Sequence, residues 1–194
     1  EGTTFTEKAL VAAEAVGFKR KHGMNDGALC GFMGYNDMNY ENQERRNTYT
    51  AFLRDVADRD TLTIHTKSLV HRILFEGDRA VGVEVEIKGK KRIIKANKEV
   101  ILCAGALETP KLLMLSGVGP ADHLKSLGIP VVKDIQSIGE NLHDHPNVAM
   151  FYQGRKPVDF GYPQMYGFQR FNPKLPLPEG QADTCMAWMS APVT

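Results

Sequence analysis

The segment that most constrains the fold is residues 99–104, which reads Glu-Val-Ile-Leu-Cys-Ala. It is apolar almost throughout instead of alternating, a pattern typical of a strand that is buried on both faces, as in a parallel sheet. Gly105 ends this run, and a helical pattern follows, with Thr109 as the expected N-cap, Pro110 as first helical residue and Gly117 as the stop. A buried strand that leads directly into a helix predicts an α/β arrangement.

The residues before this run predict an antiparallel meander. From residue 61 the sequence takes the period of a strand, with alternation in 61–65 and 69–75, one aliphatic face in 80–87 and a short strand at 93–94. Tight turns at residues 76–79 and 88–90 connect the last three of these segments. Consecutive strands joined by such turns pair in sequence order.

The two ends of the chain differ from this middle part. Residues 6–17 have helical spacing and are expected to form a helix capped by Thr6, and a second helix is expected near residues 49–56, with Asn47 or Thr48 as its cap. Between them lies a glycine-rich loop at residues 23–34. Five of the ten prolines lie between residues 157 and 178, which predicts a change of domain near residue 146.

Charge and cysteine content exclude several classes of protein. The 24 Lys and Arg residues against 23 Asp and Glu residues give a net charge of +1, which leaves no overall electrostatic footprint for nucleic acid or an anionic membrane. No apolar run approaches the roughly 18 residues of a membrane span. Three widely spaced cysteines and no glycosylation sequon argue against a disulfide framework and favour a reducing compartment such as the cytoplasm.

Three features could carry chemistry, each with a purely structural alternative. Ala104-Gly105 would let a flat ligand lie against the backbone, or it is a tight turn that serves packing alone. His143 and His145 flank Asp144, and all three are residue types that bind metals. Two ligands at this spacing complete no site, so a structural role is favoured and no metal is predicted. The aromatic residues from 151 to 171 either pack an irregular segment, which is favoured, or line a substrate cavity.

One long motif resembles a known family. Gly105-Ala106, Thr109-Pro110, a pair of leucines and Ser116-Gly117-Val118-Gly119 are similar to the second signature of the glucose–methanol–choline (GMC) oxidoreductases. Further similarity follows in the same order along the chain, at residues 46–53, 79–84, 127–131 and 139–146. The resemblance extends from about residue 6 to residue 146.

The resemblance implies FAD as cofactor and oxidation of a small-molecule alcohol by hydride transfer to the flavin. It implies part of a Rossmann-like FAD-binding domain of glutathione-reductase type with its meander, and part of a substrate domain built on an antiparallel sheet. Val70 matches the family position whose backbone amide and carbonyl read the adenine edge. Ala104 and Gly105 match the positions beside the adenosine half of FAD.

The departures from the family are equally informative. The Gly-x-Gly-x-x-Gly pyrophosphate loop and the catalytic histidine of the family are both missing, so no catalytic residue is assigned in this chain. We expect a middle piece of a longer enzyme, whose remaining segments are its partners. Residues 1–60 then join the two domains, residues 61–146 belong to the FAD-binding domain, and residues 147–194 begin the substrate domain.

Two other functions stay open at the level of the sequence. The family scaffold also hosts hydroxynitrile lyases and a light-driven fatty-acid decarboxylase. Neither of these enzymes oxidises an alcohol by hydride transfer. The chain could also be an inert fragment that only packs or binds. The sequence names neither the alcohol nor the electron acceptor, because most of the surroundings of the flavin lie outside it.

Overall fold

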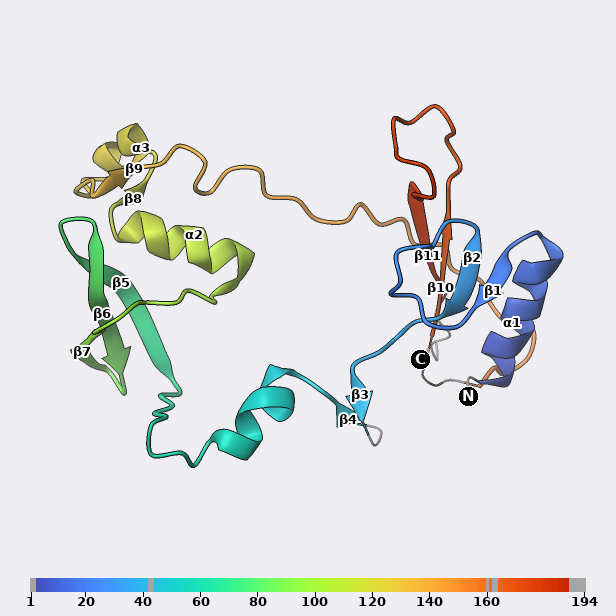
Figure 1. Cartoon of the computed structure of the whole chain (residues 1–194), viewed down its shortest axis with the longest axis horizontal. Coiled ribbons are helices and arrows are strands. Elements are labelled where there is room, and N and C mark those ends of the chain that lie inside the picture. The colour runs from blue at the N-terminus through green and yellow to red at the C-terminus, as the bar shows by residue number, and fades with distance from the viewer. Residues whose placement is uncertain (1–2, 42–43, 160, 162–163, 189–194) are drawn as a thin grey trace. The chain divides into compact units, whose positions relative to one another are not determined.

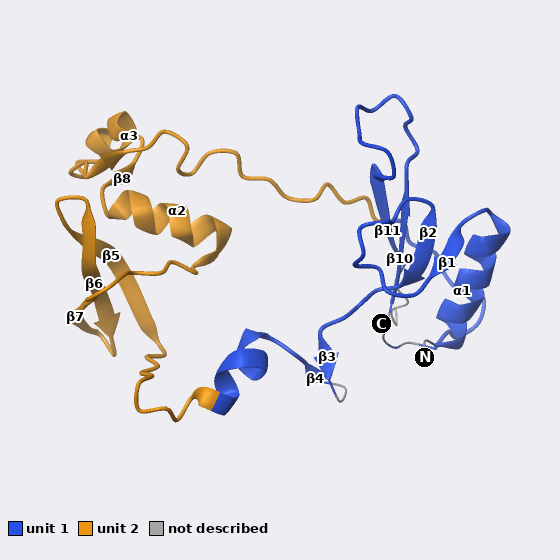
Figure 2. Ribbon diagram, in the orientation of Figure 1, with its two compact units in different colours: residues 1–55, 150–194 blue, residues 56–149 orange. Residues whose placement is uncertain are grey.

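The computed structural model describes residues 3–41, 44–159, 161 and 164–188 and has a mixed α/β fold. The chain divides into two compact units (Figures 1 and 2). Unit 1 contains residues 1–55 and 150–194, and unit 2 contains residues 56–149. The division pairs the two ends of the chain in one unit, and each unit is described below by itself.

Unit 1 is built on a four-stranded sheet that joins segments far apart in the sequence. Its strand order is β1 (Lys19–Lys21), β2 (Phe32–Tyr35), β10 (Met165–Gln169) and β11 (Thr184–Trp188). The β1–β2 pair is parallel, and the β2–β10 and β10–β11 pairs are antiparallel. A short hairpin of β3 (Tyr40–Glu41) and β4 (Glu44–Arg45) follows the first two strands.

Helix α1 (Thr4–Ala15) packs on this sheet through the core of unit 1. Leu10 and Ala13 from the helix meet Met33 and Met165 from the central strands, and all four are buried. Helix and strands therefore share one apolar core, although residues 36–164 separate β2 from β10 along the chain. Local periodicity could not reveal this pairing, because the partner strands share no turn.

The expected cap of α1 is wrong by three residues. Thr3, and not Thr6, is the N-cap, and its side chain accepts a hydrogen bond from the Thr6 backbone N–H at 3.2 Å. Asp159 accepts two more, from the Thr4 and Phe5 amides, and the Phe5 bond above all holds the pKa of this carboxyl below its usual value. Thr6 is the third residue of the helix, and its side chain is buried.

A polar network fastens α1 to the sheet of unit 1. The Tyr35 hydroxyl donates a hydrogen bond to the Glu7 carboxylate, and Arg20 donates another at 3.0 Å. The Tyr35 bond, followed by the Arg20 bond, lowers the pKa of Glu7 below its usual 4.5. Burial, followed by the hydrogen bond to Glu7, raises the pKa of Tyr35.

This network predicts a defined acid sensitivity. Because the pKa of Glu7 is lower in the folded than in the unfolded protein, the stabilisation is complete above about pH 4.5 and is lost as the pH falls through the folded pKa. We expect Glu7→Gln to lower the melting temperature of the complete protein at pH 7 and to converge with the parent once the pH has fallen below the folded pKa of Glu7. Glu179→Gln, at an exposed position, is the control, and an equal effect of both variants at pH 7 would argue against this role of Glu7.

The second expected helix is present but short and irregular. It consists of a π-helical turn, η1 (Tyr49–Leu53), followed by a 3-10 turn, η2 (Arg54–Val56). Asn47, one of the two expected caps, accepts a hydrogen bond from the Thr50 amide at 3.0 Å. Phe52 is 78% exposed, so this segment lacks the packing that would extend it.

Unit 2 contains the predicted meander. Strands β5 (Ser68–Glu76), β6 (Arg79–Ile87) and β7 (Lys90–Lys95) form an antiparallel sheet in sequence order. This confirms the three-strand prediction, whereas the alternating residues 61–65 form no strand. Those five residues have no pairing partner among the described residues, and alternation alone does not hold a strand without one.

Two helices and a small parallel pair complete unit 2. They are α2 (Gly105–Leu115), β8 (Val118–Gly119), α3 (Ala121–Ser126) and β9 (Lys133–Asp134). The expected start of α2 is wrong, because Ala104 is its N-cap and Pro110 lies inside the helix rather than at its first position. Gly105, with φ +86°, makes the turn that starts the helix earlier than Thr109.

The expected buried strand at residues 99–104 is not formed in this structure. These residues are irregular, and Ile101 is 73% exposed. A strand buried on both faces requires hydrogen-bonded neighbours, and none of the described residues pairs with this segment. The mixed α/β class holds, and the parallel sheet expected around residues 99–104 is not seen.

Ser116 ties α2 to the meander. Its buried hydroxyl accepts a hydrogen bond from the Ile73 backbone N–H at 2.8 Å and donates one to the Leu112 carbonyl at 2.6 Å. Gly117 follows with φ +88° and ends the helix, as the sequence predicts. The hydroxyl therefore fixes the end of α2 against the open edge of β5.

We expect Ser116→Ala to lower the free energy of unfolding of the complete protein by about 1–3 kcal/mol, because the buried Ile73 amide loses its acceptor. Urea denaturation measures this change. Ser126→Ala is a matched control, since the Ser126 hydroxyl bonds the His123 carbonyl at 2.7 Å in an exposed position, and its cost should stay within about 0.5 kcal/mol. Equal costs would show that the Ile73 bond contributes little.

Candidate functional site

The outer edge of β5 presents the backbone of Val70. The strand order places β5 at one edge of the meander, and Val70 pairs with Val85 on β6. The Ile73 amide donates its hydrogen bond to the Ser116 hydroxyl, which shows that it points away from β6. Along an antiparallel edge strand, backbone N–H groups point in turn toward the neighbouring strand and away from it. The register shift at His71 inserts one extra residue into this alternation. The backbone amide and carbonyl of Val70 therefore point away from β6, as the Ile73 amide does.

No described residue outside the sheet bonds the Val70 amide or carbonyl. An outward amide and carbonyl of one residue form a donor and an acceptor side by side. That arrangement matches the edge of a flat heteroaromatic ring that carries an acceptor next to a donor. The backbone at Val70 can therefore recognise such a ring without any polar side chain.

Ala104 and Gly105 lie at the beginning of α2. Ala104 has φ −86° and ψ 3°, and Gly105 follows with φ +86°, a conformation that disfavours any side chain. A Cβ placed on Gly105 would meet no atom within 4 Å, so the space beside it is open. Close packing within the described part of the chain therefore does not explain this glycine, in contrast to Gly117, where a Cβ would collide with the Pro130 carbonyl.

No side chain caps the first turn of α2. Its first N–H groups therefore have no side-chain acceptor, and the amino-terminal end of α2 is mildly electropositive. Glu108 in the first turn is held by Lys111 at 3.0 Å and so contributes little net charge. Val70, Ala104 and Gly105 all belong to unit 2, where Val70 lies on β5 and the other two lie at the start of α2.

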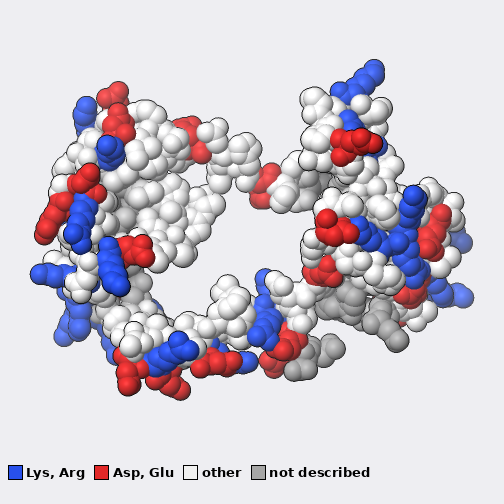
Figure 3. Space-filling model, in the orientation of Figure 1, with Lys and Arg blue, Asp and Glu red and all other residues white. Residues whose placement is uncertain are grey.

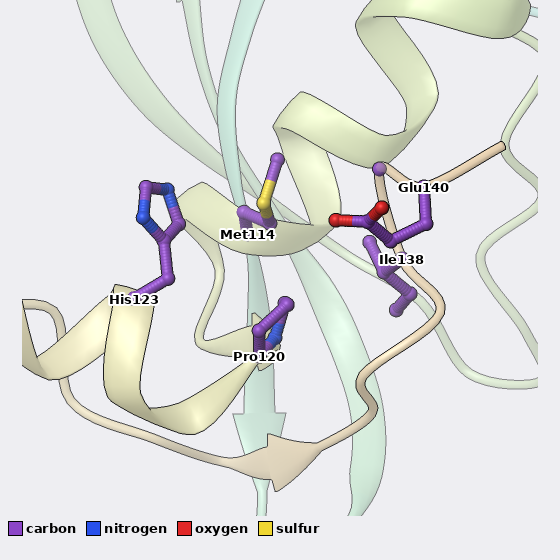
Figure 4. A pocket seen from close by; sticks show the side chains of 6 residues that line it. Met114, Pro120, His123, Ile138 and Glu140 are labelled. Atoms are coloured by element: carbon purple, nitrogen blue, oxygen red, sulfur yellow. The ribbon is translucent and has the colours of Figure 1, made fainter. Parts of the chain in front are cut away.

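A pocket of about 320 Å³ lies elsewhere in unit 2. Figure 4 shows His123 and Glu140 on opposite sides of it, with Met114 between them. Pro120, Ile138 and Gly139 complete the lining. None of the three residues singled out by the sequence lines this pocket, and it offers no nucleophile beside a base, so it carries no catalytic assignment.

The remaining sequence candidates show no assembled chemistry. The histidines at 143 and 145 are both exposed, and the described residues contain no group of three or more His, Cys, Asp or Glu side chains that could hold a metal. In the aromatic tract, Tyr166 and Phe168 pack edge to face with 6.3 Å between ring centres, whereas Phe151 is 93% exposed. Two tract members, at 160 and 162, lie outside the described residues.

Ser116 is the site-related residue that sequence reasoning missed as a positioning group. The signature includes Ser116, but only the fold shows that its hydroxyl accepts the hydrogen bond of the Ile73 amide on the edge of β5, three residues from Val70. Within the described ranges, moreover, the helices are all too short or too polar to cross a lipid bilayer.

Residues 2–147 of the chain match the family described as GMC oxidoreductase. The chain is 41% identical to human mitochondrial choline dehydrogenase over 149 residues, which covers 77% of the chain and 25% of the human protein. It is 38% identical over 161 residues to the oxygen-dependent choline dehydrogenase of Pseudomonas fluorescens strain SBW25, covering 82% of the chain and 28% of that protein. The chain thus spans about a quarter of the length of these relatives.

Solved structures agree with this relationship. The pyridoxine 4-oxidase of Mesorbium loti superposes with a TM-score of 0.65 at 33% identity, covering 71% of the chain and 27% of the oxidase. A formate oxidase superposes with a TM-score of 0.72 over 87% of the chain and 34% of its own length, and its 24% identity supports the fold alone. The expected resemblance is confirmed: the chain belongs to the GMC oxidoreductase family.

Proposed function

We propose that this chain is part of a flavin-dependent enzyme that oxidises an alcohol. The observation that carries the proposal is the family match over residues 2–147, which includes the meander and the whole α2 signature. Relatives at about 40% identity are named as choline dehydrogenases, and a solved neighbour at 31% identity is an FAD-dependent oxidoreductase from Chaetomium thermophilum. A non-redox family member or an inert fragment has no comparable support.

FAD is the proposed cofactor, and the residues of unit 2 fit its adenosine half. The outward amide and carbonyl of Val70 suit the adenine edge, and the open space beside Gly105 accepts a flat group without a side chain in the way. Ala104 adds only a methyl group there. When bound, FAD takes up the hydride that leaves the alcohol carbon.

The proposed domain organisation assigns a role to each part of the chain. Residues 1–60 would join the two domains, residues 61–146 would belong to a Rossmann-like FAD-binding domain of glutathione-reductase type, and residues 147–194 would begin the substrate domain. In that domain, residues 99–104 would gain strand neighbours from other segments of the polypeptide. Their unbroken apolar pattern supports this, because such a sequence is costly to leave exposed.

The pyrophosphate loop and the catalytic base are proposed to lie in those other segments. The sequence contains no Gly-x-Gly-x-x-Gly motif, and no catalytic histidine is assigned within it. This chain would bind the adenosine and help to form the substrate cavity. Proton removal from the alcohol would belong to a base supplied by the rest of the enzyme.

Choline is the first substrate to test, because both curated relatives described above are choline dehydrogenases. The complete polypeptide should be purified and examined for flavin absorbance, then mixed anaerobically with choline and with a panel of other primary alcohols. Loss of the oxidised-flavin absorbance on mixing supports the proposal. Bound flavin that no alcohol reduces would favour a non-redox member, and purified protein without flavin that cannot be reconstituted would overturn the FAD proposal.

A further inference from the structure

The strongest unexplained feature outside the flavin site is a concentration of positive charge in unit 2. Residues 88–98, here called the basic edge, contain six cationic residues and no acidic one: Lys88, Lys90, Lys91, Arg92, Lys95 and Lys98. Since the whole chain carries +1, its other residues together carry −5. The near-neutral total therefore conceals a local concentration of positive charge at residues 88–98.

The fold places this charge on the open edge of a sheet. The basic edge contains all of β7, the last strand of the meander, and each residue of β7 is exposed. Figure 3 shows Lys and Arg side chains gathered at the margin of unit 2 where Figure 1 places β7. Because β7 is an edge strand, long side chains from both of its faces border the same open margin.

Little of this charge is neutralised by the protein itself. Among the described residues, Lys91 alone of the six forms an ion pair, with Glu84 at 3.7 Å, and Glu84 is held more closely by Arg72 at 2.9 Å. The Arg72 bond above all keeps the pKa of Glu84 below its usual value. Five cations of the basic edge thus face solvent without a carboxylate partner in the described chain.

Two exposed isoleucines lie within the same strand. Ile93 is 62% and Ile94 is 40% exposed, and they point to opposite faces of β7. Lysines along an edge strand oppose the addition of a strand from another protein. A layer of phospholipid head groups needs no backbone register, however, and it offers phosphates for the cations and an apolar boundary for the isoleucines.

We propose that the basic edge docks this protein onto an anionic phospholipid bilayer. Six clustered cations fall within the range that binds acidic head groups. Contact is peripheral and electrostatic, with Ile93 and Ile94 at the head-group boundary. The proposal does not depend on the flavin site.

Co-sedimentation of the complete, flavin-loaded polypeptide with vesicles tests this docking. Vesicles of phosphatidylcholine with one third phosphatidylglycerol should bind the protein, pure phosphatidylcholine vesicles should not, and 0.5 M NaCl should release it. The triple variant Lys90→Gln/Arg92→Gln/Lys95→Gln should lower the partition coefficient on the order of 100-fold. The matched control, Lys8→Gln/Lys156→Gln/Lys174→Gln, removes three exposed charges elsewhere and should retain binding.

Circular dichroism and flavin content verify that each variant is folded, and the salt dependence of the parent provides a measurement that needs no variant. Equal binding by the two triple variants would overturn the assignment to β7. Absence of binding to anionic vesicles would overturn the docking itself. Retention on a poly-glutamate column without vesicle binding would also overturn it, and would identify an acidic polypeptide as the partner.

Discussion

Replacing Gly105 with valine is expected to weaken FAD binding by the complete polypeptide roughly 10- to 100-fold, because overpacking a close contact costs about 1–3 kcal/mol. The added side chain would occupy the open space that we assign to the adenosine half of the cofactor. Valine also disfavours the φ of +86° with which the chain enters α2. Titration of FAD into the apoprotein, followed by the change in flavin fluorescence, measures the dissociation constant.

Gly128→Val separates the two causes of this loss. Gly128 also has a positive φ, +69°, and a Cβ there would likewise meet no atom within 4 Å, but it follows α3 instead of preceding α2. The control therefore introduces the same kind of backbone strain without touching the proposed site. Unchanged FAD affinity in a folded Gly105→Val protein, or equal losses in both variants, would refute the placement of the cofactor beside Gly105.

The sequence predicts the features of the fold that depend on neighbours along the chain. The meander is one, because its strands alternate and its turns contain Gly77 and Gly89, both with positive φ. The short helix α3 depends on the same kind of local information, since Pro120 precedes it and Gly128 follows it. In each case the decisive information lies within a few residues, where period and capping are informative.

The features that the sequence could not predict depend on distant partners. The central pair of unit 1 joins Phe32 to Phe168, and no local pattern identifies that pairing. Residues 99–104 show the opposite case. Their pattern predicts a buried strand, but no strand in the described part of the chain pairs with them. The apolar pattern of a segment indicates which side chains it can bury. Whether the segment forms a strand also depends on which other strands are present to pair with it.

The candidate site shows the same limit. Residue chemistry left Ala104-Gly105 undecided between ligand approach and packing, and the resemblance to the family decided for the ligand. The structure adds two facts that neither could supply, namely the open space beside Gly105 and the bond from Ile73 to Ser116 that sets the outward direction at Val70. The roles of these residues toward FAD remain predictions.

The 194-residue chain expressed by itself is expected to aggregate and to lack a sharp unfolding transition. In unit 2, Ile101, Leu107 and Leu69 are 73%, 67% and 62% exposed. Apolar surface costs roughly 25 cal/mol for each Å² left in water, so these side chains favour association with one another between molecules. Light scattering after size exclusion, with calorimetry, measures both expectations.

The comparison with the complete polypeptide makes this result interpretable. If the segments outside the chain cover residues 99–104 and the exposed face of α2, the complete protein should be soluble under the same conditions and should melt cooperatively. A monomeric 194-residue product with one sharp transition would mean that the exposed apolar side chains are covered within the chain itself. Our proposal that residues 99–104 become a strand only beside other segments of the polypeptide would then be wrong, because the isolated chain would already have paired them.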